Sequence, residues 1–142
     1  MNPKDNKAKA DAYRRTEVLT ANRETILLMM YSGAMRSVKK SIEAVETGNR
    51  LEKAKHLCRA QEIINELRAN LDYKIAEEIA KNLDMLYDFI TQRLMKGNID
   101  NDIKPLQEAL GILQTLNGAW EEAIASLKKG AVPAAPATPT QK

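Results

Sequence analysis

Apolar residues recur at intervals of three and four positions along four stretches of this chain, and that spacing constrains its fold more than any other feature. The stretches span about residues 23–47, 50–71, 75–96 and 103–129. Such spacing places side chains on one face of an α-helix, whereas a strand requires alternation by two. Because the connections are short, consecutive helices are expected to be antiparallel. The sequence therefore predicts an all-α, antiparallel, up-down four-helix bundle.

Polar residues and glycines mark the ends of these predicted helices. Asn22, Asn49 and Asp102 precede three of them and are predicted N-caps, because their side-chain oxygens can accept a hydrogen bond from a free N–H of the first turn. Gly48 and Gly97 are predicted to end the first and third helices, since glycine adopts the left-handed conformation that commonly follows a helix. Together these signals set the limits of the predicted bundle.

Both ends of the chain are expected to lie outside the bundle. Residues 1–22 begin as a polar segment, and we expect a flexible N-terminal arm whose last part packs on the bundle as a lid or short helix. The predicted lid residues are Tyr13, Val18 and Leu19. Residues 130–142 contain three prolines and a single bulky apolar side chain, which is typical of a disordered tail. The helical domain is thus expected at residues 23–129.

The composition argues against several classes of protein. Of 142 residues, 44% are apolar and 29% are charged, a balance typical of a globular domain with a core. The net charge is +3 and the basic residues are interspersed with acidic ones, whereas nucleic-acid binding needs clustered cations. No apolar run reaches the ~18 residues of a membrane span, and the N-terminus lacks the apolar core of a signal peptide. With a single cysteine, these observations favour a cytoplasmic protein that binds neither nucleic acid nor membrane.

Side chains suited to catalysis or metal binding are sparse. His56 is the only histidine, and with Glu52 it has no second pair, whereas a di-iron bundle needs two. Cys58 lies beside an apolar seam, where we expect a small buried side chain. No glycine-rich phosphate loop or Ser-His-Asp set is present, so neither an enzyme nor a cofactor is expected. The alternatives that stay open are a histidine phosphotransfer bundle working through His56 and another regulatory helical adaptor.

Some apolar residues fall outside the predicted seams and suggest a binding surface. Residues 26–31 are all apolar, so they surround a helix that needs only one apolar face to join a bundle. Methionine side chains adapt to more than one packing partner, and apolar grooves on helical bundles suit amphipathic helices. The residues predicted to bind a partner are Leu28, Met29, Ile63, Met85, Phe89 and Ile112.

A set of motifs in one order and spacing extends over roughly residues 12–125. The longer motifs are Leu-Leu-Met-Met-Tyr-Ser-Gly-Ala at 27–34, Arg-Ala-Gln-Glu-Ile-Ile-Asn-Glu-Leu at 59–67 and Glu-Ile-Ala-Lys-Asn-Leu-Asp-Met-Leu-Tyr-Asp-Phe at 78–89. The shorter ones are Ala12-Tyr13, Asn70-Leu71-Asp72, Arg93-Leu94, Asp102 and Ala119-Trp120. With these motifs the chain resembles the flagellin-specific export chaperones of the FliS family.

Two positions depart from the pattern of that family. The family usually has Ser-Pro at the start of the first long helix, where this chain has Asn22 followed by arginine. The family also tends to have Gly-Gly before the Glu-Ile-Ala motif, where this chain has Ile-Ala-Glu at 75–77. No glycine or proline separates the second and third predicted helices, and Asp72 is the candidate N-cap there, so these two helices can join differently.

The resemblance implies a cytoplasmic chaperone. Members of the family bind the disordered C-terminal segment of flagellin, which folds into helices as it wraps the bundle. This prevents premature polymerisation and delivers the subunit to the flagellar type III export apparatus. For this chain the resemblance implies flagellin as the partner of the predicted binding residues, with export gate components and flagellar regulators as further partners. In the family, the segment that corresponds to the surroundings of Tyr13 can occupy part of the apolar surface when flagellin is absent.

Overall fold

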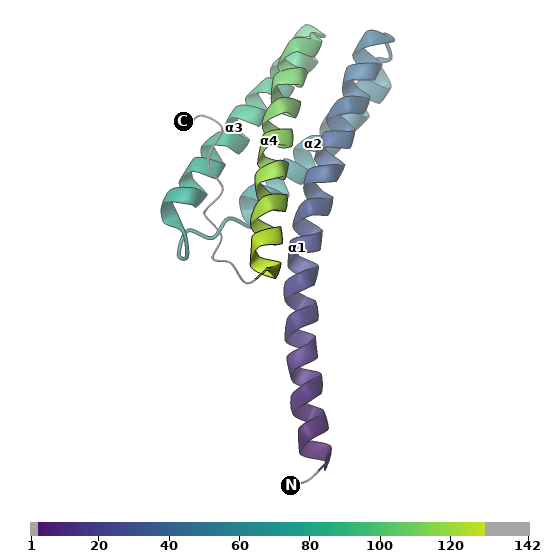
Figure 1. Cartoon of the computed structure of the whole chain (residues 1–142). Helices are drawn as coiled ribbons and strands as arrows, with labels where there is room; N and C mark the ends of the chain where they lie inside the picture. Colours follow the sequence, from purple (N-terminus) through teal and green to yellow (C-terminus); the bar gives the residue numbers. More distant parts are fainter. Residues whose placement is uncertain (1–2, 130–142) are drawn as a thin grey trace.

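Helices joined by turns make up the described part of the protein. A computed structural model describes the backbone of residues 3–129 and the side chains of residues 6–12 and 22–129. The helices are α1 (Pro3–Glu46), α2 (Arg50–Ala69), α3 (Glu77–Asp100) and α4 (Ile103–Lys128). Each helix packs on two others, in the cyclic order α1, α2, α3, α4 (Figure 1). The predicted all-α class is confirmed, and the arrangement is compatible with a four-helix bundle.

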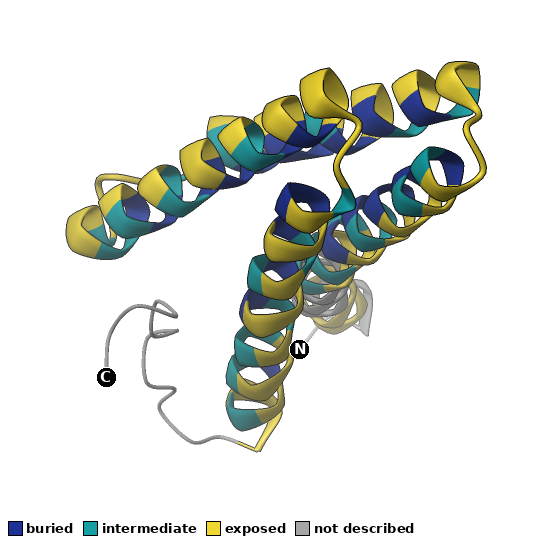
Figure 2. Cartoon of the chain, turned by 90° about the horizontal axis from the view of Figure 1, so that it is seen from above, coloured by how far each residue is buried: buried dark blue, intermediate teal, exposed yellow. Residues whose placement is uncertain are grey.

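The core lies where the four helices face one another. Figure 2 shows buried residues along the inner sides of the helices and exposed residues along the outer sides. Ile64 of α2 and Ile90 of α3 have no exposed surface, and the same holds for Leu113 of α4. Burial of one such side chain contributes about 1.5–3 kcal/mol. The apolar residues spaced by three and four therefore form one continuous core, as the sequence predicts.

The first helix is longer than the sequence predicted. α1 runs without a break from Pro3 to Glu46, so the predicted start at residue 23 and the predicted N-cap at Asn22 are wrong. Alanine and lysine are frequent before Asn22, and no glycine or proline follows Pro3 there, so nothing ends the helix. The predicted lid side chains, those of Tyr13, Val18 and Leu19, lie outside the described residues. The predicted tail at 130–142 lies outside them as well.

The turn between α1 and α2 and the turn between α3 and α4 lie at the same end of the bundle, which we call the turn end. It comprises residues 47–53 and 97–106. The Asn49 side chain accepts a hydrogen bond from the backbone N–H of Glu52 at 3.1 Å. The Asp102 carboxylate accepts one from the backbone N–H of Lys104 at 3.0 Å. Gly48 has a left-handed backbone, with φ of 72°. These two N-caps and this glycine stop are confirmed.

Gly97 lies inside α3 and lets α3 approach α4 closely. A Cβ atom at this position would lie 2.5 Å from Cδ2 of Leu106 and 3.0 Å from the carbonyl oxygen of Asp102. The helix continues beyond the glycine and is followed by Asn101, which has φ of 49°. Asparagine tolerates this left-handed conformation better than most residues. The predicted helix end at Gly97 is therefore wrong, because the glycine serves helix packing.

Lys53 ties α2 to the last turn of α3. Its side chain is buried, and its ammonium donates hydrogen bonds to the carbonyl of Asn98 at 3.0 Å and to Oδ1 of Asn101. The last carbonyls of a helix have no partner within the helix and carry partial negative charge. Because α3 has no basic residue in its own last turn, Lys53 supplies both the donors and the positive charge.

The connection between α2 and α3 is an irregular turn. α2 ends at Ala69 and α3 begins only at Glu77. Between them, the Asp72 carboxylate accepts hydrogen bonds from the backbone N–H groups of Lys74 at 3.0 Å and Ile75 at 3.2 Å. Asp72 therefore stabilises the turn itself, and the predicted N-cap role of Asp72 and the predicted helix start at residue 75 are both wrong. Local bonding by aspartate competes with helix formation in this way.

Candidate functional site

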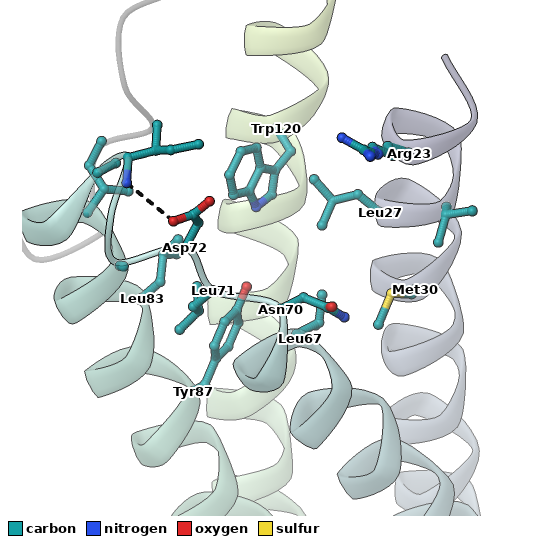
Figure 3. A pocket seen from close by; sticks show the side chains of 15 residues that line it. Arg23, Leu27, Met30, Leu67, Asn70, Leu71, Asp72, Leu83, Tyr87 and Trp120 are labelled. Carbon is teal, nitrogen blue, oxygen red and sulfur yellow. Dashed lines mark hydrogen bonds between the residues drawn. The ribbon is translucent and has the colours of Figure 1, made fainter. Parts of the chain in front are cut away.

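An apolar groove, which we call the end groove, opens at the end of the bundle opposite the turn end. Its volume is about 620 Å³. Figure 3 shows side chains from α1, α2, α3, α4 and the connection between α2 and α3 around it. Its lining is mostly apolar and consists of Arg23, Ile26, Leu27, Met30, Leu67, Asn70, Leu71, Asp72, Ile75, Ala76, Ile79, Ala80, Leu83, Tyr87 and Trp120.

Large apolar side chains at the rim of the end groove are in contact with solvent. Ile26 is 55% exposed and Ile75 is 85% exposed. Leu27 and Met30 are half-buried and pack against the core from the α1 side. Contiguous apolar surface of this kind marks a place where another molecule binds. The groove thus offers a floor attached to the core and a rim that a partner can cover.

A second hollow lies next to the end groove, between α1 and α2. Its volume is about 760 Å³, and its lining includes Ile63, Ala69 and more polar residues of α2. Ile26 and Met30 line both this hollow and the end groove. A partner segment that covers these two residues would therefore contact both hollows at once.

Three aromatic side chains are hydrogen-bonded at the floor of the end groove. The indole N–H of Trp120 donates to the hydroxyl of Tyr31 at 3.1 Å, and the hydroxyls of Tyr31 and Tyr87 are bonded to each other. These residues come from α4, α1 and α3, so the cluster joins three helices. Burial is the main factor that raises the pKa of both tyrosines. Both hydroxyls are therefore protonated at neutral pH and available as donors.

A salt bridge supports the outer side of the wall that α2 and α3 form. The Arg68 guanidinium lies 2.9 Å from the carboxylate of Asp84 and 3.6 Å from that of Asp88. The hydrogen bond to Asp84 is the main factor that raises the pKa of Arg68. Leu67 and Leu83, which precede Arg68 and Asp84 in sequence, both line the end groove. The ion pair therefore holds together two helices whose apolar faces form the site.

The sequence matches the family described as "Flagellar protein FliS" over residues 5–127. The chain belongs to the FliS family. The "Flagellar secretion chaperone FliS" of Bacillus subtilis is 33% identical over 118 residues, which cover 83% of this chain and 87% of that protein. The protein of the same name from Salmonella typhimurium is 32% identical over 117 residues, with 82% and 87% covered. That of Escherichia coli is 27% identical over 110 residues, with 77% and 81% covered.

Membership of the FliS family defines the general role of the protein. FliS proteins are chaperones of flagellar export and are not enzymes, so this chain has a chaperone role in flagellar export. The prediction that the chain is not an enzyme is therefore confirmed. No helix in the described part of the chain is long and apolar enough to cross a membrane. Within that part, no cluster of histidine, cysteine, aspartate or glutamate side chains is arranged to hold a metal ion.

The residues predicted to bind a partner are distributed over all four helices of this FliS-family chain. Met29 and Met85 are 67% and 70% exposed, and Phe89 is 41% exposed beneath the guanidinium of Arg93. These three are surface apolar residues, as the helical wheel predicted. Leu28 is half-buried. None of these four residues lines the end groove, and their role in binding stays a prediction.

Two of the predicted binding residues pack against the core instead. Ile63 is only 8% exposed and its Cδ1 lies 3.3 Å from the place where a Cβ on Gly33 would be. Its placement outside the apolar face of α2 is therefore wrong, because α2 packs on both α1 and α3 and buries a wide arc. Ile112 is half-buried and packs on the core. Ile63 does line the second hollow, but as a buried side chain rather than an exposed one.

Sequence reasoning missed the end groove as a site. The spacing of three and four along the first helix includes Leu27 and Met30 and predicts that both are buried, whereas both line the groove. One signal pointed to it: Trp120 is the only tryptophan of the chain, and it lines the groove. Leu71 and Ile75 gave no such signal, because the sequence predicted both within helices and the structure places them in the connection between α2 and α3.

The histidine and the cysteine have ordinary positions on α2. Nε2 of His56 lies 3.1 Å from a carboxylate oxygen of Glu52, one helical turn earlier. Cys58 is exposed, so its predicted buried position is wrong. The adjacent Leu57 takes the core position, with 6% of its surface exposed. Nothing in this arrangement favours a histidine phosphotransfer function.

Proposed function

We propose that the protein binds the C-terminal segment of flagellin in the cytoplasm and that the end groove holds part of that segment. One observation carries this proposal: a FliS-family chain leaves an apolar groove open at its surface. The rim residues Ile26 and Ile75 are 55% and 85% exposed. A subunit that assembles through apolar helix faces presents matching surface before assembly, and amphipathic segments bind in such grooves.

The proposed mechanism is occupancy. A flagellin segment that lies on the chaperone is not available for polymerisation, and no nucleotide or covalent step is needed. Folding of a disordered segment on binding costs roughly 2–5 kcal/mol of the interaction energy, so a large contact surface is required. The end groove, the second hollow and the exposed side chains of Met29, Met85 and Phe89 together provide such a surface. Release at the flagellar export apparatus completes the proposed cycle.

A lid role for the N-terminal arm is part of this proposal. In Figure 1 the first part of α1 projects beyond the ends of the other helices. For the arm to reach the groove, α1 has to break ahead of Arg23, which lines the groove. Deletion of residues 1–21 is then expected to raise the affinity for flagellin, because no competing segment has to be displaced. Unchanged or lower affinity would contradict the lid role.

The binding experiment uses a peptide that spans the C-terminal segment of flagellin. Because Trp120 is the only tryptophan and lines the end groove, its fluorescence reports binding to this site directly. We expect a 1:1 complex and a gain in helicity. Absence of binding at tens of micromolar peptide would refute the proposal.

A matched pair of variants locates the binding site. Ile26→Asp places a charge at the rim of the end groove, and Leu51→Asp places one on a side chain that is 79% exposed at the turn end. Both substitutions replace an exposed aliphatic side chain, so neither is expected to unfold the protein. We expect Ile26→Asp to weaken peptide binding at least about tenfold, since it desolvates a carboxylate in an apolar contact. Equal effects of both substitutions would exclude the end groove as the site.

A further inference from the structure

The aromatic cluster at the floor of the end groove has more donor hydrogens than hydrogen bonds. Trp120 contributes one N–H, and Tyr31 and Tyr87 contribute one O–H each. Two hydrogen bonds connect the three side chains, from the indole to Tyr31 and between the two hydroxyls. One hydroxyl hydrogen is therefore left over, and no acceptor for it is found among the residues that the structure describes.

The position of each tyrosine relative to the groove decides which one keeps the spare hydrogen. Tyr31 has no exposed surface, and its oxygen already accepts the indole N–H of Trp120. If Tyr87 donated to Tyr31, the hydrogen of Tyr31 would be enclosed without an acceptor, which is more unfavourable than one hydrogen bond is favourable. If Tyr31 donates to Tyr87 instead, every group on Tyr31 is satisfied. The spare hydrogen then belongs to Tyr87.

Tyr87 is the member of the pair that faces the groove. It belongs to the groove lining and Tyr31 does not. Figure 3 shows the Tyr87 hydroxyl beside Leu71, pointing toward Trp120 and the interior of the groove. Only 2% of the surface of Tyr87 is exposed, so a partner that fills the groove encloses this side chain completely. That partner has to supply an acceptor or leave a buried donor unpaired.

We propose that Tyr87 donates a hydrogen bond to a main-chain carbonyl oxygen of the segment that fills the end groove, and that this bond selects which part of a partner binds there. The inference rests on the proposed function and specifies its chemistry. In the middle of a helix each carbonyl already accepts an N–H from four residues later, whereas the last four carbonyls of a helix are free. The groove therefore selects an apolar segment at the end of a helix or at a turn.

The test compares two tyrosine variants of the cluster, of which Tyr31→Phe removes two hydrogen bonds and Tyr87→Phe removes one. Tyr87→Phe and Tyr31→Phe each remove one buried hydroxyl, so both are expected to lower the melting temperature. Only Tyr87→Phe removes the proposed donor to the partner. With calorimetric titration of the flagellin C-terminal peptide, we expect Tyr87→Phe to weaken binding about 3- to 10-fold and Tyr31→Phe to leave affinity within about twofold. Unchanged affinity of Tyr87→Phe, or equal loss in both variants, would overturn the inference.

A peptide variant distinguishes a main-chain carbonyl acceptor from a side-chain amide acceptor. In this peptide every asparagine and glutamine is replaced by alanine, so that main-chain carbonyls are the only amide acceptors left. The weaker binding of Tyr87→Phe is expected to persist with this peptide. If the difference between wild type and Tyr87→Phe disappears, the main-chain assignment is wrong.

Small probes separate this inference from flagellin binding. N,N-dimethylbenzamide carries a carbonyl and no N–H, and isopropylbenzene has a similar shape without the carbonyl. Chemical shifts of the Trp120 indole N–H at millimolar probe should show that the amide binds wild type more tightly than Tyr87→Phe, while the hydrocarbon binds both equally. Absent or equal binding of the amide would overturn the inference whatever flagellin does. A positive amide result with no flagellin binding would instead refute the proposed function.

Discussion

The two ends of the bundle differ in how they treat polar and apolar groups. At the turn end, short connections at 47–49 and 101–102 are closed by side-chain caps, and Lys53 supplies donors to the end of α3. At the end groove, the longer connection at 70–76 leaves apolar surface open, and Ile75 in it is 85% exposed. One end pairs the polar groups of its turns within the chain, and the other presents an apolar groove to a partner.

This difference separates stability from binding along one helical bundle. A helix end whose polar groups are all paired resists local opening, whereas an exposed apolar groove gains its packing only on binding. Substitutions at the turn end are therefore expected to lower the free energy of unfolding and to spare affinity. Substitutions at the rim of the groove should do the reverse.

The largest effect on stability is expected from Leu106→Ala. Leu106 has no exposed surface and fills the space that Gly97 leaves open between α3 and α4. The cavity should lower the free energy of unfolding by about 2–5 kcal/mol, measured by chemical denaturation. Leu127→Ala on the same helix is the control, because Leu127 is 51% exposed and should change stability by less than about 0.5 kcal/mol. Equal effects of the two would show that the turn end is no more tightly packed than the surface.

A smaller loss of stability is expected from Lys53→Met. The substitution keeps an apolar chain of similar length and removes the donors to Asn98 and Asn101, which should cost about 1–3 kcal/mol. Lys55→Met removes the same charge from an exposed position on α2 and serves as the control. If both variants unfold at the same denaturant concentration as wild type, the ammonium contributes nothing to closing this end.

High pH is expected to weaken the floor of the groove. In the folded protein the pKa values of Tyr31 and Tyr87 lie above the ordinary value of 10.0, mainly because of burial. Their stabilising contribution is complete below about pH 10 and is lost as pH rises further, by about 1.4 kcal/mol per pH unit for each tyrosine. Unfolding free energies measured from about pH 8 to about pH 11 should fall less steeply in the Tyr31→Phe/Tyr87→Phe double variant. Parallel slopes would mean that these hydroxyls ionise freely in the fold.

The all-α class and the capped turns were predictable because they follow from local rules. The caps at Asn49 and Asp102 need only the chemistry of the first helical turn, and Gly48 needs only its own backbone. The same rules failed at Asn22, where the helix already continues from Pro3, and at Asp72, whose carboxylate bonds within the turn. A good N-cap residue permits a helix start, and the flanking sequence decides whether one occurs.

The end groove was not predictable in the same way because it depends on how four elements meet. A helical wheel treats each helix as if it had one narrow buried face. It therefore placed Ile63 outside the core, although contacts with two helices bury it, and it placed Leu27 and Met30 inside although no neighbour covers them fully. Exposure depends on the partner helices that are present, which the spacing within a single helix does not record.

The smallest effect on stability, and the sharpest test of the comparison, is expected from Met29→Asp. Met29 is 67% exposed on α1, close in sequence to Ile26 and Met30, which line the end groove. Met95 is 58% exposed on α3, toward the turn end. Neither Met29→Asp nor Met95→Asp should change the free energy of unfolding by more than about 0.5 kcal/mol. Titration with the flagellin peptide should show weaker binding for Met29→Asp alone, because a carboxylate there lies beside the occupied surface. If Met95→Asp weakens binding as much, the partner extends along α3 as far as the turn end, and the separation between a stable end and a binding end fails.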